Sequence, residues 1–140
     1  MRENPIFGQI FPQGEKLPEE FSAYFIGQAY RAPLVRDEAL NCPVSNVTFS
    51  PGCRNNWHIH YAKNGGGQML ICVAGRGWYQ EYGKEPRELH PGDVVNIPAE
   101  VKHWHGATQD SKLVHLSVTT KNGKNHIEWK ELVKSNEYNL

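Results

Sequence analysis

The sequence has no excess of charge of either sign. Its 140 residues contain 15 Lys and Arg against 15 Asp and Glu, so the formal net charge is zero. Nucleic acids and anionic membrane surfaces attract proteins through basic patches. We therefore expect neither nucleic acid nor a membrane as a partner. A net charge near zero also removes one barrier to self-association.

Long apolar runs are missing as well. The segment 1–5 does not resemble the apolar core of a secretory signal, and no stretch approaches the length of a transmembrane helix. The three cysteines, Cys42, Cys53 and Cys72, are odd in number and show no C-x-x-C spacing. Reduced thiols fit this usage, and together these absences predict a cytoplasmic protein.

Glycine and proline, by contrast, are frequent. The 13 glycines and 9 prolines divide the middle of the chain into short, largely alternating or apolar segments. These strand candidates are 44–50, 68–74, 78–82, 93–97 and 112–120. Short strands between Gly and Pro turns are typical of an antiparallel sandwich or barrel. The length fits one domain, so we predict a single all-β domain.

The two ends of the chain carry weaker signals. Residues 1–40 are predicted to form an N-terminal arm in which 24–35 makes an edge strand, since Pro33 suits an edge. Residues 41–140 would form the barrel and its tail. The stretch 127–133 has apolar residues at helical spacing, which predicts one or two helical turns packed on the barrel.

Histidines are the strongest functional signal. His58 and His60 form one H-x-H pair, His103 and His105 form another, and His115 follows ten residues later. In a strand, side chains two residues apart point to the same side. One such pair arises by chance in many proteins, but two pairs separated by strand and turn patterns predict a metal site.

Fixed spacings connect these histidines to other residues. In order they are Gly52, His58, His60, Gln68 and Gly75, then Gly92, Pro98 and His103. This order resembles the paired motifs of the cupin family, G-x5-H-x-H-x3-4-E-x6-G and G-x5-P-x-G-x2-H-x3-N. The resemblance extends over about 44–118 and implies a double-stranded β-helix, a jelly-roll barrel. It also implies that His58, His60 and His103 are metal ligands, with Gln68 in the place of the family's glutamate.

The sequence departs from the family pattern at several points. The gap after His60 is seven residues (61–67) instead of three or four, Glu100 stands at a glycine position, and the final asparagine is absent. The glutamine has the largest chemical consequence, because a carboxamide does not neutralise a metal's charge as a carboxylate does. The alternative is that Gln68 only fills space and water completes the coordination.

A narrower resemblance comes from three further stretches, 75–78, 90–95 and 102–107, followed by 114–116. They look like small bacterial cupins related to manganese-dependent hydroxynitrile lyases, and to cupins associated with carboxymuconolactone decarboxylases. In the lyases three His and one Gln bind the metal, and a late histidine is the base, which implies that role for His115. His105 is predicted to be either a second acid–base group or a support for the ligands.

Strand alternation places a further set of side chains on the inner faces. Ser45, Val47 and Phe49 share one face of an early strand, and Ser117 and Thr119 share the face of His115. The resemblance implies a small apolar substrate pocket, for which Val47, Phe49 and Trp78 would supply walls.

The resemblance implies one divalent metal per chain (manganese first, with zinc, nickel or iron as alternatives) and a homodimer. The predicted activity is a metal-dependent lyase on a small carbonyl-derived or hydroxynitrile-like substrate. An iron-dependent dioxygenase and a metal-binding module without catalysis are the alternatives, since one fold hosts many chemistries.

Overall fold

The computed structural model describes residues 9–35, 41–63, 65–120 and 125–139. Within these ranges almost all regular structure is β. The elements are β1 (Glu15–Lys16), the 3-10 helix η1 (Glu19–Tyr24), β2 (Phe25–Ile26), β3 (Ala29–Val35), β4 (Val44–Phe49), β5 (Arg54–Asn55), β6 (His58–Tyr61), β7 (Gly67–Gly75), β8 (Gly77–Glu81), β9 (Arg87–Leu89), β10 (Val94–Pro98), β11 (His103–Ala107), β12 (Leu113–Thr119), β13 (His126–Trp129) and α1 (Ser135–Tyr138).

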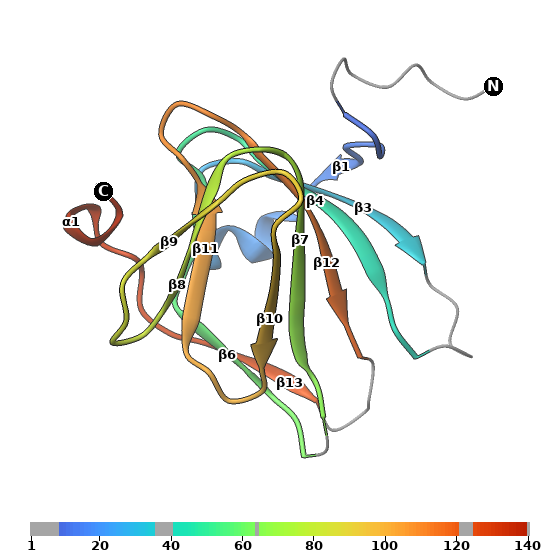
Figure 1. Cartoon of the computed structure of the whole chain (residues 1–140), viewed down its shortest axis with the longest axis vertical. Helices are drawn as coiled ribbons and strands as arrows, with labels where there is room; N and C mark the ends of the chain where they lie inside the picture. Colours follow the sequence, from blue (N-terminus) through green and yellow to red (C-terminus); the bar gives the residue numbers. More distant parts are fainter. Residues whose placement is uncertain (1–8, 36–40, 64, 121–124, 140) are drawn as a thin grey trace.

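Two antiparallel sheets face each other and form the barrel (Figure 1). One sheet has the order β1-β3-β4-β12-β7-β10, and the other runs β13-β6-β11-β5-β2, with β8 on β11 and β9 on β8. Many neighbouring strands are far apart in sequence, as β4 and β12 are. This arrangement is a jelly roll and confirms the predicted all-β barrel. The predicted strands of the middle of the chain are present as β4, β7, β8, β10 and β12.

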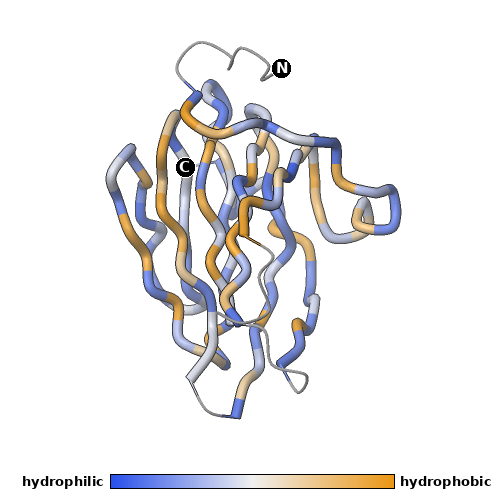
Figure 2. Tube along the Cα trace, turned by 90° about the vertical axis from the view of Figure 1, so that its right-hand side faces the viewer, coloured by the Kyte–Doolittle hydropathy of each residue, from blue (hydrophilic) through white to orange (hydrophobic). Residues whose placement is uncertain are grey.

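The core lies between the sheets. Apolar and polar residues alternate along several strands (Figure 2), so each strand turns one side inward. The fully buried side chains of this core include Phe49, Leu70, Ile97 and Leu113. β12 lies in the middle of its sheet and pairs with β4 on one side and β7 on the other. Its position therefore fixes how the inward side chains of three strands lie relative to one another.

The N-terminal residues add strands to both sheets. β3 pairs with β4, with an irregular register between Pro33 and Val35, and β2 pairs with β5. The predicted strand over 24–35 is thus two strands with a turn at Gly27, whose φ is +92°. Residues 1–8 and 36–40 of the predicted N-terminal arm lie outside the described residues, and its part in a homodimer stays a prediction.

At the other end, the short C-terminal helix is confirmed, but its predicted position is wrong. Ile127 and Trp129 belong to β13, where they pair with His60 and His58 of β6. The open edge of β6 offers backbone hydrogen bonds to this segment, and its apolar residues two apart suit a strand equally well. The helix α1 begins later, at Ser135, and its Tyr138 packs on Trp104 with ring centroids 5.9 Å apart. None of the described helices has the length and apolarity needed to cross a membrane.

Candidate metal centre

The strand register brings the two H-x-H pairs together. β6 and β11 are antiparallel neighbours, and His58 and His103 are directly paired. Their ring centroids lie 4.2 Å apart, and the ring of His60 lies 5.2 Å from that of His58 and 5.6 Å from that of His103. Three imidazoles therefore gather at the inner face of one sheet, although they come from segments more than forty residues apart.

Backbone contacts orient two of these rings. The Nδ1 atom of His58 lies 2.8 Å from the carbonyl oxygen of Asn56, and the Nδ1 atom of His103 lies 2.9 Å from that of Val101. A carbonyl only accepts, so each Nδ1 donates and each Nε2 keeps its lone pair. The Nε2 of His103 is buried with no hydrogen-bond partner among the described residues. A free, buried lone pair on an oriented imidazole is what a metal ligand requires.

Gln68 contributes an oxygen from the opposite sheet. Its Nε2 donates to Ser117 Oγ at 2.8 Å, which fixes the orientation of the amide. Its Oε1 is buried and has no hydrogen-bond partner within the described residues. Imidazole nitrogens and an amide oxygen together suit a divalent first-row metal. The unpartnered Nε2 of His103 and Oε1 of Gln68 therefore fit a bound ion.

Burial keeps these imidazoles neutral. It lowers the pKa of His58 well below its usual value, with a further contribution from His103. It lowers the pKa of His60 to about 4, again helped by His103 and opposed by the nearby Gln68 side chain. The pKa of His103 is also lowered by burial. Metals bind the unprotonated ring, so near neutral pH a metal would not have to displace a proton.

His105 is a second candidate for the third nitrogen. Nitrogen atoms of His58, His103 and His105 all lie within 4.8 Å of one another. The ring of His105, however, also contacts two residues that are not candidate ligands. Asn55 Nδ2 lies 3.2 Å from its Nδ1, and Phe49 stacks on it at 5.4 Å. Two sets of three nitrogen ligands are thus possible. Both contain His58 and His103, and the third nitrogen comes from His60 in one set and from His105 in the other.

A cavity of about 320 Å³ opens beside these histidines. Five of the predicted pocket residues line it: Ser45, Val47, Phe49, Ser117 and Thr119. The predicted ligands His58, His60 and Gln68 also line it, together with aromatic residues from η1, β2 and β13. The cavity therefore combines an apolar wall with imidazole and amide groups that come from both sheets.

His115 reaches this cavity from β12. It is fully buried, and neither ring nitrogen has a hydrogen-bond partner in the described part of the chain. Its ring meets that of His105 edge to face at 5.0 Å, so histidines of the two sheets touch inside the barrel. Burial lowers the pKa of His115 to about 3. It is therefore a neutral imidazole with a free lone pair, and its role as an acid–base group stays a prediction.

Comparison with known proteins agrees with this architecture. The family model for the cupin domain matches residues 45–119, which include all the candidate ligands. The chain is a cupin. It is 39% identical over 117 residues to (R)-mandelonitrile lyase of Granulicella tundricola, covering 82% of this chain and 86% of that one.

Solved structures are similar over nearly the whole chain. A cupin-like protein of Thermotoga maritima has a TM-score of 0.81 and 43% identity, covering 93% of this chain and 94% of its own. A cupin-2 domain protein of Rhodospirillum rubrum has a TM-score of 0.68 and 22% identity, covering 96% and 86%, and shows the fold alone.

The prediction that Trp78 forms a wall of the substrate pocket needs a correction in this cupin. It packs against a separate cluster that contains Trp57, Trp104 and Val133, and it does not line the cavity. The register explains this placement. Trp78 pairs with Gly106 on β11 and so lies one residue out of step with His105, on the opposite face. Its aromatic character suggested a pocket wall, but alternation along β8 turns it outward.

Several residues that line the cavity could not be predicted from the sequence alone. Asn55 holds both the backbone N of His105, through its Oδ1 at 3.0 Å, and the His105 ring. Phe21, Phe25 and Trp129 enter from segments at the two ends of the chain. Only the β5–β11 pairing, in which Arg54 lies opposite Gly106, shows that Asn55 lies beside His105.

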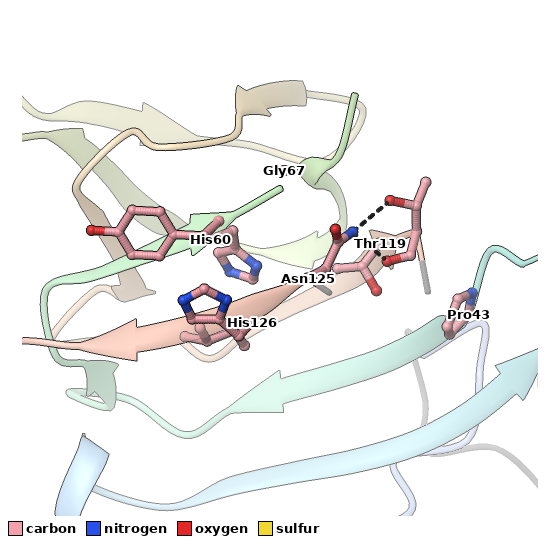
Figure 3. Close-up of a pocket in the computed structure, with 9 residues that line it drawn as sticks. Pro43, His60, Gly67, Thr119, Asn125 and His126 are labelled. Atoms are coloured by element: carbon pink, nitrogen blue, oxygen red, sulfur yellow. Dashed lines mark hydrogen bonds between the residues drawn. The ribbon is translucent and has the colours of Figure 1, made fainter. Parts of the chain in front are cut away.

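A second, smaller cavity of about 220 Å³ adjoins the site. His60 and Thr119 line both cavities, and Figure 3 shows His60 and His126 toward one end of the smaller one. Tyr61 and Gly67, the ends of the long gap after His60, also line it. The insertion relative to the family motif thus shapes a space on the outer side of His60.

Separate substitutions distinguish the two possible ligand sets. Because the family motif implies His60 as the third nitrogen ligand, we expect His60→Ala to lower the metal content of the purified cupin to near zero. His105→Ala should retain near-stoichiometric metal, since the His105 ring is already engaged by Asn55 and Phe49. Elemental analysis of both variants beside the wild type measures this. Full metal in His60→Ala with loss in His105→Ala would assign the third nitrogen to His105 instead.

Proposed function

We propose that this cupin is a metal-dependent lyase that cleaves a small cyanohydrin into a carbonyl compound and hydrogen cyanide. The observation that carries the proposal is the neutral, unpartnered His115 in an apolar cavity that also contains His58, His60 and Gln68. The name of the Granulicella relative, (R)-mandelonitrile lyase, supports the same reaction class.

His115 would move the proton. In the reaction the bond between the carbinol carbon and the nitrile carbon breaks, and its electron pair leaves with cyanide. The hydroxyl proton passes to a ring nitrogen of His115 and from there to cyanide, so that atoms and charge balance. Because burial lowers the pKa of His115 to about 3, the ring keeps this proton only while the cyanide anion lies beside it.

The other histidines would have supporting roles. A divalent metal held by His58, His60, Gln68 and His103 would stabilise the oxygen that loses its proton, as a Lewis acid does. All four ligands are uncharged, so none of them would offset the metal's charge. We assign His105 to positioning, since Asn55 holds its ring and its edge contact limits the orientation of His115.

We propose manganese as the ion, one per chain. Nitrogen and oxygen donors without a thiolate accept manganese, and they also accept zinc, nickel and iron. Metal analysis of the purified protein therefore comes first. Iron together with oxygen uptake would point to a dioxygenase and against the lyase.

A direct assay tests the activity. Manganese-loaded protein is mixed with racemic mandelonitrile in mildly acidic buffer, where spontaneous breakdown is slow, and benzaldehyde is followed by its ultraviolet absorbance. We expect release well above the protein-free rate, loss after chelation, and recovery when manganese is added back. Equal rates with and without metal-loaded protein, for mandelonitrile and for aliphatic cyanohydrins, would reject the lyase.

A further inference from the structure

The cavity of this cupin carries a charge that the reaction just proposed does not use. Arg31 of β3 is among the residues that line it, and the lining residues that the structure describes include no Asp or Glu. Arg31 is therefore the one arginine, lysine or acidic side chain among the described residues that line the cavity.

Sheet register places Arg31 in line with the proposed base. Arg31 on β3 is paired with Val47 on β4, and Val47 is paired with His115 on β12. Residues directly opposite each other in adjacent strands point to the same face. Arg31, Val47 and His115 therefore form one row across the inner side of the sheet. Neighbouring strands are about 4.8 Å apart, so the backbones of Arg31 and His115 are roughly 10 Å apart.

The guanidinium of Arg31 is held at the rim of the cavity. Its Cζ lies 5.8 Å from the centroid of the Phe21 ring, which itself lines the cavity from η1. Glu15 is paired with Arg31 across β1 and β3, yet no carboxylate within the described ranges forms an ion pair with it. Its guanidinium is therefore not neutralised by an ion pair with any carboxylate that the structure describes.

We propose that Arg31 binds a carboxylate at the end of the substrate remote from the reacting carbon. Val47 lies between Arg31 and His115, and Phe49, Phe25 and Trp129 also line the cavity. The substrate class is therefore an apolar body, about as long as one aromatic ring, with the reacting carbinol at one end and a carboxylate at the other. This inference rests on the proposed lyase function and names its substrate class.

Binding of a carboxylate by arginine should change the affinity for the substrate by a measurable factor. A guanidinium can donate two parallel hydrogen bonds to a carboxylate, and a hydrogen bond to a charged group contributes enough to change affinity about tenfold or more. Because Arg31 lies at the exposed rim, salt would screen part of this contribution. The preference for a carboxylate should accordingly shrink as ionic strength rises.

The test compares two cyanohydrins, those of benzaldehyde and of 4-carboxybenzaldehyde. We expect the wild type to have the higher kcat/KM for the carboxylate compound. In Arg31→Gln the ratio of the two kcat/KM values should fall about tenfold or more, with Arg31→Lys in between. Arg87→Gln removes an exposed arginine that does not line the cavity and should keep the wild-type ratio. An unchanged ratio in Arg31→Gln, or no preference in the wild type, overturns the proposal.

A binding measurement separates this proposal from the lyase itself. If neither cyanohydrin is cleaved, the lyase fails, but calorimetry with 4-(hydroxymethyl)benzoate and manganese-loaded protein still reports on Arg31. Binding that weakens about tenfold in Arg31→Gln, and not in Arg87→Gln, supports the carboxylate site. Equal binding of this acid by the wild type and Arg31→Gln, or equal binding of benzyl alcohol and the acid by the wild type, overturns it.

Discussion

Replacing His103 with alanine is expected to leave a folded cupin with almost no bound metal and no lyase activity above background. His103 is completely buried, and its ring centroid lies 4.2 Å from that of His58 and 5.6 Å from that of His60. It therefore belongs to either possible ligand set. Loss of a partner outside the first coordination sphere already costs about 10–100-fold in metal affinity or activity, and we expect loss of this nitrogen to cost more.

The measurement is elemental analysis of the purified variant, together with the cyanohydrin assay and a thermal unfolding curve. The matched control is His90→Ala. His90 is exposed, does not line the cavity, and has its ring Nε2 3.3 Å from Glu88 Oε1. That control should retain metal and activity. A His103→Ala protein that unfolds cooperatively and still holds one metal ion per chain would contradict the assigned centre.

The inward orientation of the candidate metal-site histidines could be predicted because their signal is local. An H-x-H pair on a strand fixes which side its rings occupy, and the Gly and Pro turns located the strands around it. The meeting of His58 with His103 depends on β6 lying beside β11, a long-range pairing that only the family motif implied. The motif implied His60 as the third nitrogen ligand. The structure adds His105 as an alternative, because His103 and His105 of β11 both face inward and both lie close to His58.

The errors have physical causes too. Ile127 and Trp129 suit a helix or a strand by their spacing, and the free edge of β6 decided for the strand. Trp78 has the character of a pocket wall, but the pairing of β8 with β11 turns it to the outer cluster. Arg31 showed no pattern at all in the sequence. It acquires a possible role only through the row that it forms with Val47 and His115, two strands away.

Replacing His115 with leucine should abolish turnover and yet stabilise the protein, most of all in acid. General acid–base groups contribute about 10²–10⁴-fold to rate, so we expect at least a hundredfold loss of kcat. Leucine is close to histidine in size. It removes two buried ring nitrogens that have no partner among the described residues, and each such group costs about 1–3 kcal/mol when buried.

The pH dependence follows from the direction of the shift. Burial lowers the folded-state pKa of His115 to about 3, against about 6.5 in the unfolded chain. Above about pH 6.5 both states are neutral at this residue, so it has no effect on the pH dependence. Between about pH 6.5 and pH 3 the unfolded chain binds a proton that the folded protein does not. His115 therefore destabilises the fold by about 1.4 kcal/mol for each pH unit in that window.

At pH 5 the advantage of His115→Leu over the wild type should accordingly be about 2 kcal/mol larger than at pH 7. Urea unfolding of the chelated proteins at both pH values measures it, with His90→Leu as the exposed control. A variant that is less stable than the wild type at pH 5, or one that keeps full activity, would remove His115 from its assigned role. The expected result instead ties the acid sensitivity of the fold to the residue that its chemistry needs.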